Sequence, residues 1–186
     1  MKRVVIHWTG GTHEASDYER GRYHELVEGD GNRVLGHKPP ESNKAPLGSD
    51  YVRHTGGLNT DSIGIAVCAM GGKDVKENPL VTGKWPITPS QVKAIVKVAA
   101  EYCEIYNIPV TPKTVLTHAE VRGTFGRGVY KWDITYLPGM TKTASPQEIG
   151  NRLRSLIQKE LDRSKAQKKP EKKLNFFQRL FGRRHR

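Results

Sequence analysis

Apolar residues gather in short stretches that are rich in β-branched side chains and are bounded by turn residues. Stretches of this kind predict β-strands. The expected strands cover residues 3–6, 23–27, 33–35, 62–69 and 114–117. The run over 62–69 is the most continuous, which favours a central strand covered on both faces. The turn Gly29-Asp-Gly-Asn32 predicts a hairpin between the second and third strands.

Two further stretches repeat apolar residues at the helical period, and each begins with a capping box. Thr88-Pro-Ser-Gln91 places proline at the first helical position and begins a helix that ends before Pro109. The apolar stripe of this helix consists of Val92, Ile95, Val96, Ala99, Cys103 and Tyr106. Ser145-Pro-Gln-Glu148 begins a second helix. The residues of the second helix that are expected to point inward are Ile149, Leu153, Leu156 and Ile157.

The remaining stretches are polar or rich in glycine and proline. Residues 12–20 can hold a short helix, whereas residues 36–50, 71–86 and 119–144 are predicted to be irregular. The loop over 36–50 is long enough to be functional rather than a mere connection. Because strands and helices are interspersed, the pattern predicts an α/β domain over residues 1–162.

The positive charge is concentrated at the C-terminal end of the chain. Residues 163–186 hold ten lysines and arginines and one glutamate, a net charge of +9, so only +3 of the total +12 belongs to residues 1–162. Residues 163–173 show no periodicity and are predicted to be a charged linker. Residues 174–186 place Leu174, Phe177, Leu180 and Phe181 at helical spacing among arginines, which predicts a basic amphipathic helix. Such a helix can insert its apolar face into an anionic membrane surface.

The cysteines and the N-terminal residues indicate the cellular compartment in which the protein is expected. Cys68 and Cys103 lie in separate apolar segments, which favours two buried thiols in a reducing compartment over a disulfide. The N-terminal residues lack the apolar core of a signal peptide, and no apolar run is long enough to span a bilayer. We therefore expect a cytoplasmic protein.

His7 and His118 are the strongest candidates for chemistry because each follows an apolar run of strand type. Neighbouring strands would bring the two imidazoles together, although an isolated histidine is more often a surface or hydrogen-bonded residue. An open zinc site needs three protein ligands and a water. Asp133 would complete the set. Glu120 is the alternative third ligand or base, although it is expected to face solvent.

Other candidates surround these ligands in the sequence. Lys131, two residues before Asp133, could stabilise an oxyanion. Tyr23 and His24 are adjacent on a predicted strand and point to opposite faces, so only one of them can serve the site. Trp8 and Trp132 flank the proposed ligands and could form walls for stacking against a sugar, although tryptophans are core residues by default.

Five segments occur in an order that resembles a known family. They are Val5-Ile-His-Trp-Thr-Gly10, Tyr23-His-Glu-Leu-Val-Glu-Gly-Asp-Gly31, His54 with Asn59-Thr-Asp-Ser-Ile-Gly-Ile65, Thr117-His-Ala-Glu-Val121 and Lys131-Trp-Asp133. Together they resemble the zinc-dependent N-acetylmuramoyl-L-alanine amidases of the type 2 family, which includes phage endolysins and is related to peptidoglycan recognition proteins. The resemblance spans residues 3–157.

The resemblance implies a mixed central sheet flanked by helices, with a zinc cleft at one side. The family's ligands match His7, His118 and Asp133, and its active-site lysine and tyrosine match Lys131 and Tyr23. His54 falls where the family has a histidine near the substrate groove. Two departures stand out: the segment between His7 and Tyr23 is short, and the loop over 36–50 aligns poorly.

The implied function is zinc-dependent hydrolysis of the amide bond between N-acetylmuramic acid and L-alanine in peptidoglycan, by a monomeric phage-type endolysin. Trp8 and His54 are expected to contact substrate. The basic tail is expected to bind an anionic membrane or lipopolysaccharide, with the enzyme released from the host cytoplasm to act on the periplasmic wall. The alternatives are a non-catalytic peptidoglycan-binding module and a cytoplasmic muropeptide-recycling amidase. A nucleic-acid-binding protein would explain the basic arm but not the two histidines and the aspartate, so no specific nucleic-acid partner is expected.

Overall fold

The computed structural model describes the backbone of residues 1–181 and the side chains of residues 1–167. The described residues form a five-stranded mixed sheet with the strand order β3-β2-β4-β1-β5. Its strands are β1 (Arg3–Trp8), β2 (Glu25–Val27), β3 (Arg33–Leu35), β4 (Ser62–Val67) and β5 (Val115–Thr117). All the predicted strands are present, and every residue of the central strand β4 is buried, as expected.

Strand direction decides where the site can form. β1 runs parallel to both of its neighbours, β4 and β5, and β4 also runs parallel to β2. Only the predicted hairpin of β2 and β3 is antiparallel. β2 begins later than predicted, so Tyr23 and His24 lie just before it rather than in it. The carboxyl ends of four strands therefore meet at one edge of the sheet.

The described helices are α1 (Asp17–Arg20), the 3-10 helix η1 (Pro40–Asn43), α2 (Pro89–Ile105), α3 (His118–Phe125) and α4 (Pro146–Phe181). At α2 the predicted capping box is present, with Thr88 Oγ1 accepting from the backbone of Gln91. At α4 Ser145 Oγ accepts from the backbone of Glu148. The prediction that residues 119–144 are wholly irregular is wrong, because α3 occupies the first part of this stretch.

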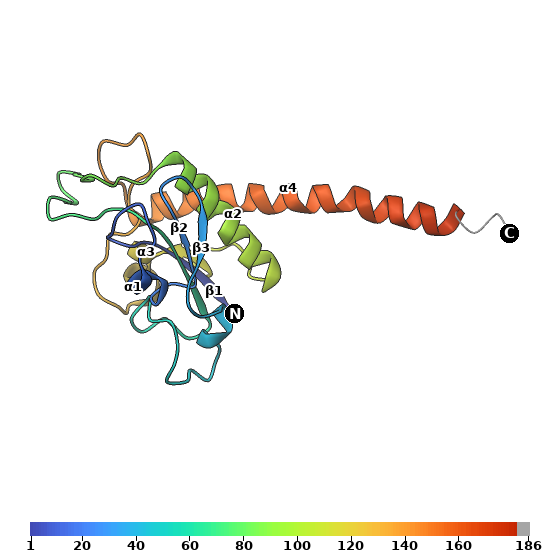
Figure 1. Ribbon diagram of the computed structural model, residues 1–186, viewed down its shortest axis with the longest axis horizontal. Coiled ribbons are helices and arrows are strands. Elements are labelled where there is room, and N and C mark those ends of the chain that lie inside the picture. The colour runs from blue at the N-terminus through green and yellow to red at the C-terminus, as the bar shows by residue number, and fades with distance from the viewer. Residues whose placement is uncertain (182–186) are drawn as a thin grey trace.

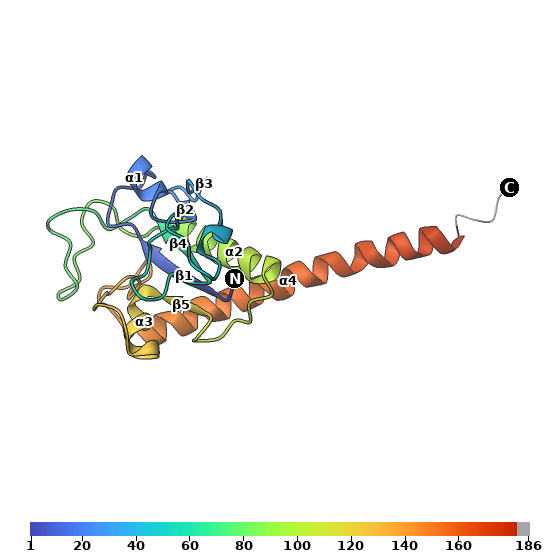
Figure 2. The same cartoon turned by 90° about the horizontal axis from the view of Figure 1, so that it is seen from below.

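The sheet lies between two layers of unequal size (Figures 1 and 2). Alternate residues of β1, namely Val4, Ile6 and Trp8, join the large apolar cluster with α2 and α4. Val5 belongs to the opposite face, where the apolar cluster is small and includes Val121 of α3. His7 follows the same alternation and points to the face of Val5.

Helix α4 packs on the body through its first turns and then continues away from it (Figure 1). The buried apolar residues in its described part, residues 146–167, are Ile149, Leu153, Ile157 and Leu161, at every fourth position. Leu156 was expected to point inward, but it lies on the flank of this stripe with 40% of its surface exposed. The predicted linker over 163–173 and the amphipathic helix over 174–186 fall largely outside the residues whose side chains are described, so both stay predictions.

Two further expectations concern the cysteines and the membrane. Cys68 and Cys103 are buried free thiols, as predicted. Burial raises the pKa of each thiol to about 12, which keeps both protonated at neutral pH. Within residues 1–181, no helix combines the length and the apolar character that crossing a bilayer requires.

Candidate metal centre and catalytic cleft

The sheet register brings His7 and His118 together. β1 and β5 are parallel neighbours, and Ile6 is paired with Thr117. The next residue of each chain segment is a histidine, so both imidazoles lie at the same edge of the sheet. Their ring centroids are 4.6 Å apart. The expected meeting of the two strand ends is therefore present.

Asp133 joins the two histidines from the loop that follows α3. Its Oδ2 atom lies 3.1 Å from Nδ1 of His7 and 3.2 Å from Nδ1 of His118. The loop is held in place because the backbone N–H of Ala119 donates to the carbonyl oxygen of Asp133 over 2.7 Å. The three potential ligand atoms lie within 4.8 Å of one another.

The protonation states of this cluster suit a cation. Burial lowers the pKa of His7 to about 4, so its imidazole is neutral at neutral pH. Burial alone would raise the pKa of the Asp133 carboxyl, but hydrogen bonds from His118 and His7 hold it below its ordinary value. A neutral imidazole and a carboxylate are the forms that bind a metal ion.

The surroundings of His7 also fit a metal ligand. Nε2 of the neighbouring His54 lies 3.3 Å from the carbonyl oxygen of Ser62, to which it must donate. Nδ1 of His54 is therefore an acceptor, and it lies 3.3 Å from Nε2 of His7. Thr55 Oγ1 offers a second acceptor at 3.3 Å. A cation at Nδ1 of His7 would leave the imidazole proton on Nε2, where these partners can accept it.

The cluster opens into a cleft of about 730 Å³. Its walls include Tyr23 and Lys131, the two residues expected to take part in catalysis. The ring of Tyr23 lies 5.2 Å from that of His7, and burial raises the pKa of its phenol, which keeps the hydroxyl protonated. Lys131 is exposed on the loop that carries Asp133. The cleft can therefore present two proton donors beside a bound cation.

The residues expected to contact substrate are mostly buried. Trp8 lines the cleft but exposes only 9% of its surface, because it packs edge-to-face against Trp132 at 4.6 Å and also contacts Tyr136. His54 exposes 8%, and both of its ring nitrogens contact protein atoms. His54 also lines the cleft, and because its Nδ1 atom lies 3.3 Å from Nε2 of His7, it can support that imidazole as well.

Two arginines of the cleft were not singled out from the sequence. Arg22 lies over the ring of Tyr18 at 5.4 Å, and Arg53 lies over the ring of Tyr51 at 5.1 Å. All four residues line the cleft. Their positions in the sequence could have indicated both arginines, because Arg22 directly precedes Tyr23 and Arg53 directly precedes His54.

The environment of Glu120 differs from the one that the sequence predicts. It was expected to face solvent, yet it is 1% exposed and forms a buried ion pair with Arg154 of α4. Its carboxylate oxygens are used by Arg154 and by the backbone N–H of Thr117. It therefore does not compete with Asp133 as the third ligand.

Comparison with known proteins agrees with this geometry. Residues 1–139 match the profile of the family described as N-acetylmuramoyl-L-alanine amidase. A comparison of the sequence with curated proteins finds no match.

Similar folds occur among solved structures. The Staphylococcus aureus hydrolase AmiA, solved in complex with its ligand, is 16% identical, with a TM-score of 0.56 over 86% of this chain and 72% of that one. The N-acetylmuramyl-L-alanine amidase AmiD from E. coli is 23% identical, with a TM-score of 0.46 over 64% and 49% of the two chains. PlyL is 17% identical, with a TM-score of 0.45 over 86% and 82%.

The likeness to AmiA shows the fold, and the match to the family profile extends over well more than half of the chain. The sheet, its flanking helices and the matched sequence lead to the same conclusion. The protein belongs to the type 2 family of N-acetylmuramoyl-L-alanine amidases.

Proposed function

We propose that the protein is a zinc-dependent amidase that cleaves the bond between the lactyl group of N-acetylmuramic acid and L-alanine in peptidoglycan. The observation that carries this proposal is the convergence of His7, His118 and Asp133 within 4.8 Å at the cleft that also holds Tyr23 and Lys131. Two imidazoles and one carboxylate are a donor set that zinc accepts in catalytic sites.

The roles of the protein's own residues follow from their positions. A zinc ion held by the three ligands would supply Lewis acidity toward the amide carbonyl and would lower the pKa of a water. The ammonium group of Lys131 and the hydroxyl of Tyr23 donate to the oxyanion as the carbonyl carbon becomes tetrahedral. Tyr23 can do so across the neutral pH range because its raised pKa keeps the phenol protonated.

The charge of the cleft fits an acidic peptide. Arg22 and Arg53 add two fixed cations to its walls, and stacking on tyrosine limits the freedom of both guanidinium groups. We infer that they bind carboxylates of the peptide stem. Trp8 stays the candidate for contact with the sugar, through the part of its ring that lines the cleft.

Mass spectrometry of purified peptidoglycan after incubation with the protein tests the proposal. Free stem peptides that begin with L-alanine are expected, and a chelator should abolish their release until zinc is restored. Undigested sacculi that still retain the zinc-loaded protein would instead indicate a binding module without catalysis. Cleavage of soluble muropeptides but not of sacculi would indicate a recycling enzyme.

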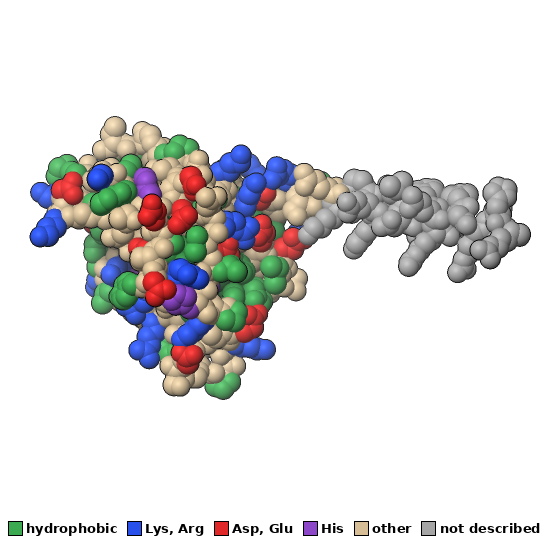
Figure 3. Space-filling model, viewed as in Figure 1, with side chains coloured by type: hydrophobic (Ala, Val, Ile, Leu, Met, Phe, Trp, Pro, Cys, Tyr) green, Lys and Arg blue, Asp and Glu red, His purple; other side chains and the backbone are tan. Residues whose placement is uncertain are grey.

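We further propose that the enzyme is an endolysin that is made in the host cytoplasm and acts on the periplasmic wall after release. The support is the charge distribution. Residues 163–186 carry a net charge of +9. Lys93, Lys97, Lys159 and Arg163 line an apolar groove of about 650 Å³ between α2 and α4. Basic side chains gather where α4 leaves the body (Figure 3). Each cation near an anionic membrane contributes about 1 kcal/mol of binding free energy.

Removal of residues 174–186 tests the role of the tail. The shortened chain is expected to hydrolyse purified peptidoglycan at the full rate, because the cleft-lining residues that the structure describes all lie between Trp8 and Asp133. Lysis of intact Gram-negative cells should decrease, and added salt should decrease lysis by the full chain in the same way. Equal lysis by both chains would remove the membrane from the proposal.

A further inference from the structure

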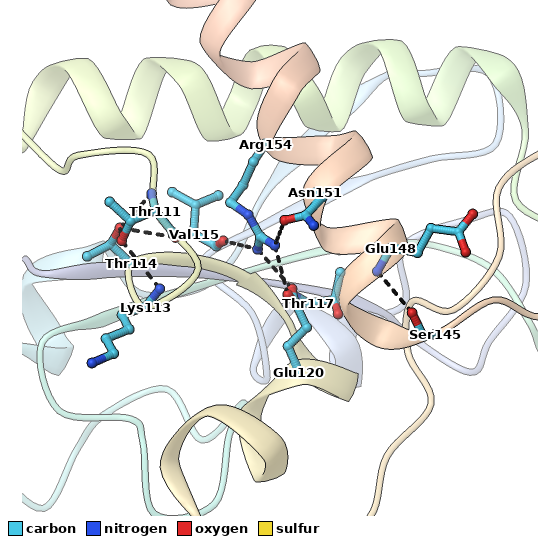
Figure 4. A network of polar contacts seen from close by, with 10 residues as sticks. All are labelled: Thr111, Lys113, Thr114, Val115, Thr117, Glu120, Ser145, Glu148, Asn151 and Arg154. Carbon is cyan, nitrogen blue, oxygen red and sulfur yellow. Dashed lines mark hydrogen bonds and ion pairs between the residues drawn. The ribbon is translucent and has the colours of Figure 1, made fainter.

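A buried ion pair connects α4 to the metal centre without touching the cleft. Arg154 of α4 is 7% exposed and Glu120 of α3 is 1% exposed. The guanidinium group donates from Nη2 to Oε1 over 2.9 Å and from Nη1 to Oε2 over 3.1 Å (Figure 4). The same guanidinium also donates to the carbonyl oxygen of Val115 and to Oδ1 of Asn151. Arg154 therefore joins α4, α3 and the first residue of β5.

Glu120 in turn anchors the backbone next to His118. Its Oε2 atom accepts from the backbone N–H of Thr117 over 2.9 Å, directly before the histidine. On the other side of the histidine, the backbone N–H of Ala119 donates to the carbonyl oxygen of Asp133. Both chain neighbours of His118 are thus fixed, one by Glu120 and the other by Asp133. These two hydrogen bonds hold the backbone on both sides of the His118 side chain.

Gly150 shows how closely α4 approaches this point. A Cβ atom at Gly150 would lie 2.1 Å from Oε2 of Glu120, so any other residue would displace the carboxylate. Glycine is unfavourable inside a helix, and here its lack of a side chain allows the contact. The carboxylate thus lies directly against the helix, where only a paired charge is tolerated.

A buried ion pair is a weak source of stability, because desolvation offsets much of the attraction between the charges. In some proteins the role documented for such a pair is to fix one geometry. Bidentate pairing of arginine with a carboxylate fixes orientation as well as distance. Arg154 also lies beyond residues 1–139, the part that matches the family profile.

We propose that Arg154, acting through Glu120, is a positioning residue for the metal ligands His118 and Asp133. The inference rests on the proposed metal site. Neither residue is among those that line the cleft. Together they determine where β5 ends and α3 begins, and hence the angle at which the His118 imidazole meets the carboxylate of Asp133.

The test measures metal binding and ligand geometry rather than turnover. Zinc affinity is obtained by competition with a chromogenic chelator, and ligand geometry by the visible spectrum of the cobalt-substituted full-length protein. Arg154→Met is expected to weaken zinc binding by about ten- to a hundred-fold, as the loss of residues that support metal ligands does. The cobalt spectrum should change as well.

Two conservative variants and one control complete the design. Arg154→Lys keeps the charge but cannot reproduce the fork of hydrogen bonds, so an intermediate loss is expected. Glu120→Gln keeps an acceptor for Thr117 but loses the charged pair, and should also weaken binding. Arg152→Met is the control, because Arg152 lies on the same helix in an exposed ion pair with Glu148. The control should bind zinc as the wild type does.

The outcomes separate this inference from the proposed function. If the wild-type protein binds no zinc, the proposed metal site fails and the positioning role fails with it. If the wild type binds zinc and Arg154→Met lowers only the melting temperature, with unchanged zinc affinity and cobalt spectrum, the pair is structural and the inference alone is overturned. Should Arg154→Met not fold, Arg154→Lys and Glu120→Gln decide the question by the same two measurements.

Discussion

The two faces of the central sheet are built from alternate residues of the same strands, yet their contents differ. Toward α2 and α4, β1 presents Val4, Ile6 and Trp8 to one continuous apolar cluster. Toward α3 it presents Val5 and His7, and the apolar cluster there is small. The buried polar residues beside that small cluster include His7, His54, Glu120 and Asp133.

This difference means that one face of the sheet provides most of the stability of the fold, whereas the other face holds the functional groups. Buried polar groups cost free energy unless they are paired, so a face full of them contributes little net stability. The apolar face therefore has to hold the sheet together while the polar face is arranged for binding. Substitutions on the two faces should accordingly produce different losses, and four variants test this separation.

Asp133→Ala should have the largest effect. Removing the carboxylate between His7 and His118 leaves two ligands, which do not make a catalytic zinc site. Zinc content after gel filtration and stem-peptide release should both fall to background. Asp162→Ala removes an exposed carboxylate from α4 and should change neither. Full zinc content in Asp133→Ala would contradict the assigned ligand set.

Lys131→Ala, a substitution on the polar face, should lower the turnover number while leaving zinc binding intact. The lysine is exposed and is not a ligand, so zinc content and the melting temperature should remain those of the wild type. Loss of one oxyanion donor should lower kcat by about a hundred- to a thousand-fold. Lys142→Ala, another exposed lysine, is the control. If Lys131→Ala lost zinc as completely as Asp133→Ala, the two residues would not have separate roles.

Ile65→Ala tests the apolar face. Ile65 is fully buried in the central strand opposite Ile6, and the substitution should reduce the free energy of unfolding by about 3 kcal/mol. Denaturant unfolding measures the loss. Ile105→Ala is the matched control, because Ile105 is 65% exposed at the end of α2. Zinc affinity of the folded Ile65→Ala protein should be unchanged; a marked decrease would mean that the faces are not separable.

His54→Ala should have the smallest effect of the four. It removes an acceptor from Nε2 of His7 while leaving all three proposed ligands in place. Zinc affinity should fall by about tenfold, as measured by chelator competition. His37→Ala removes an exposed histidine that pairs with Asp17 and should have no effect. An unchanged affinity in His54→Ala would show that Thr55 alone supports His7.

Much of the apolar face could be predicted from the sequence because its signals are local. The strands coincide with β-branched runs that are visible in the sequence. Helices α2 and α4 begin after Thr88 and Ser145, the capping residues that the sequence predicts. Leu156 was misplaced because a helical repeat alone does not show how wide the buried stripe is. In α4 the contacts are made at every fourth residue, and Leu156 lies beside them.

The polar face was predictable only in part, because its contacts join residues far apart in the chain. His7 and His118 could be paired, since both follow strand-type runs, and Asp133 could be named as the third ligand, but nothing local in the sequence shows that the loop after α3 brings it to the two histidines. The partner of Glu120 is Arg154, and nothing near Glu120 in the sequence indicates it. Helix α3 was hidden by Gly123 and Gly126, although Thr117 and Glu120 have the spacing of a capping box.

The packing of α4 also determines where the chain can be divided without damage to the catalytic domain. Ile149, Leu153, Ile157 and Leu161 belong to the main core, and Arg154 between them holds Glu120. A fragment cut at residue 139, where the family match ends, would lose one side of its core and the anchor of its active site together. Exchange of the C-terminal segment should therefore use a junction after Leu161, so that the residues that follow are replaced without disturbing the catalytic unit.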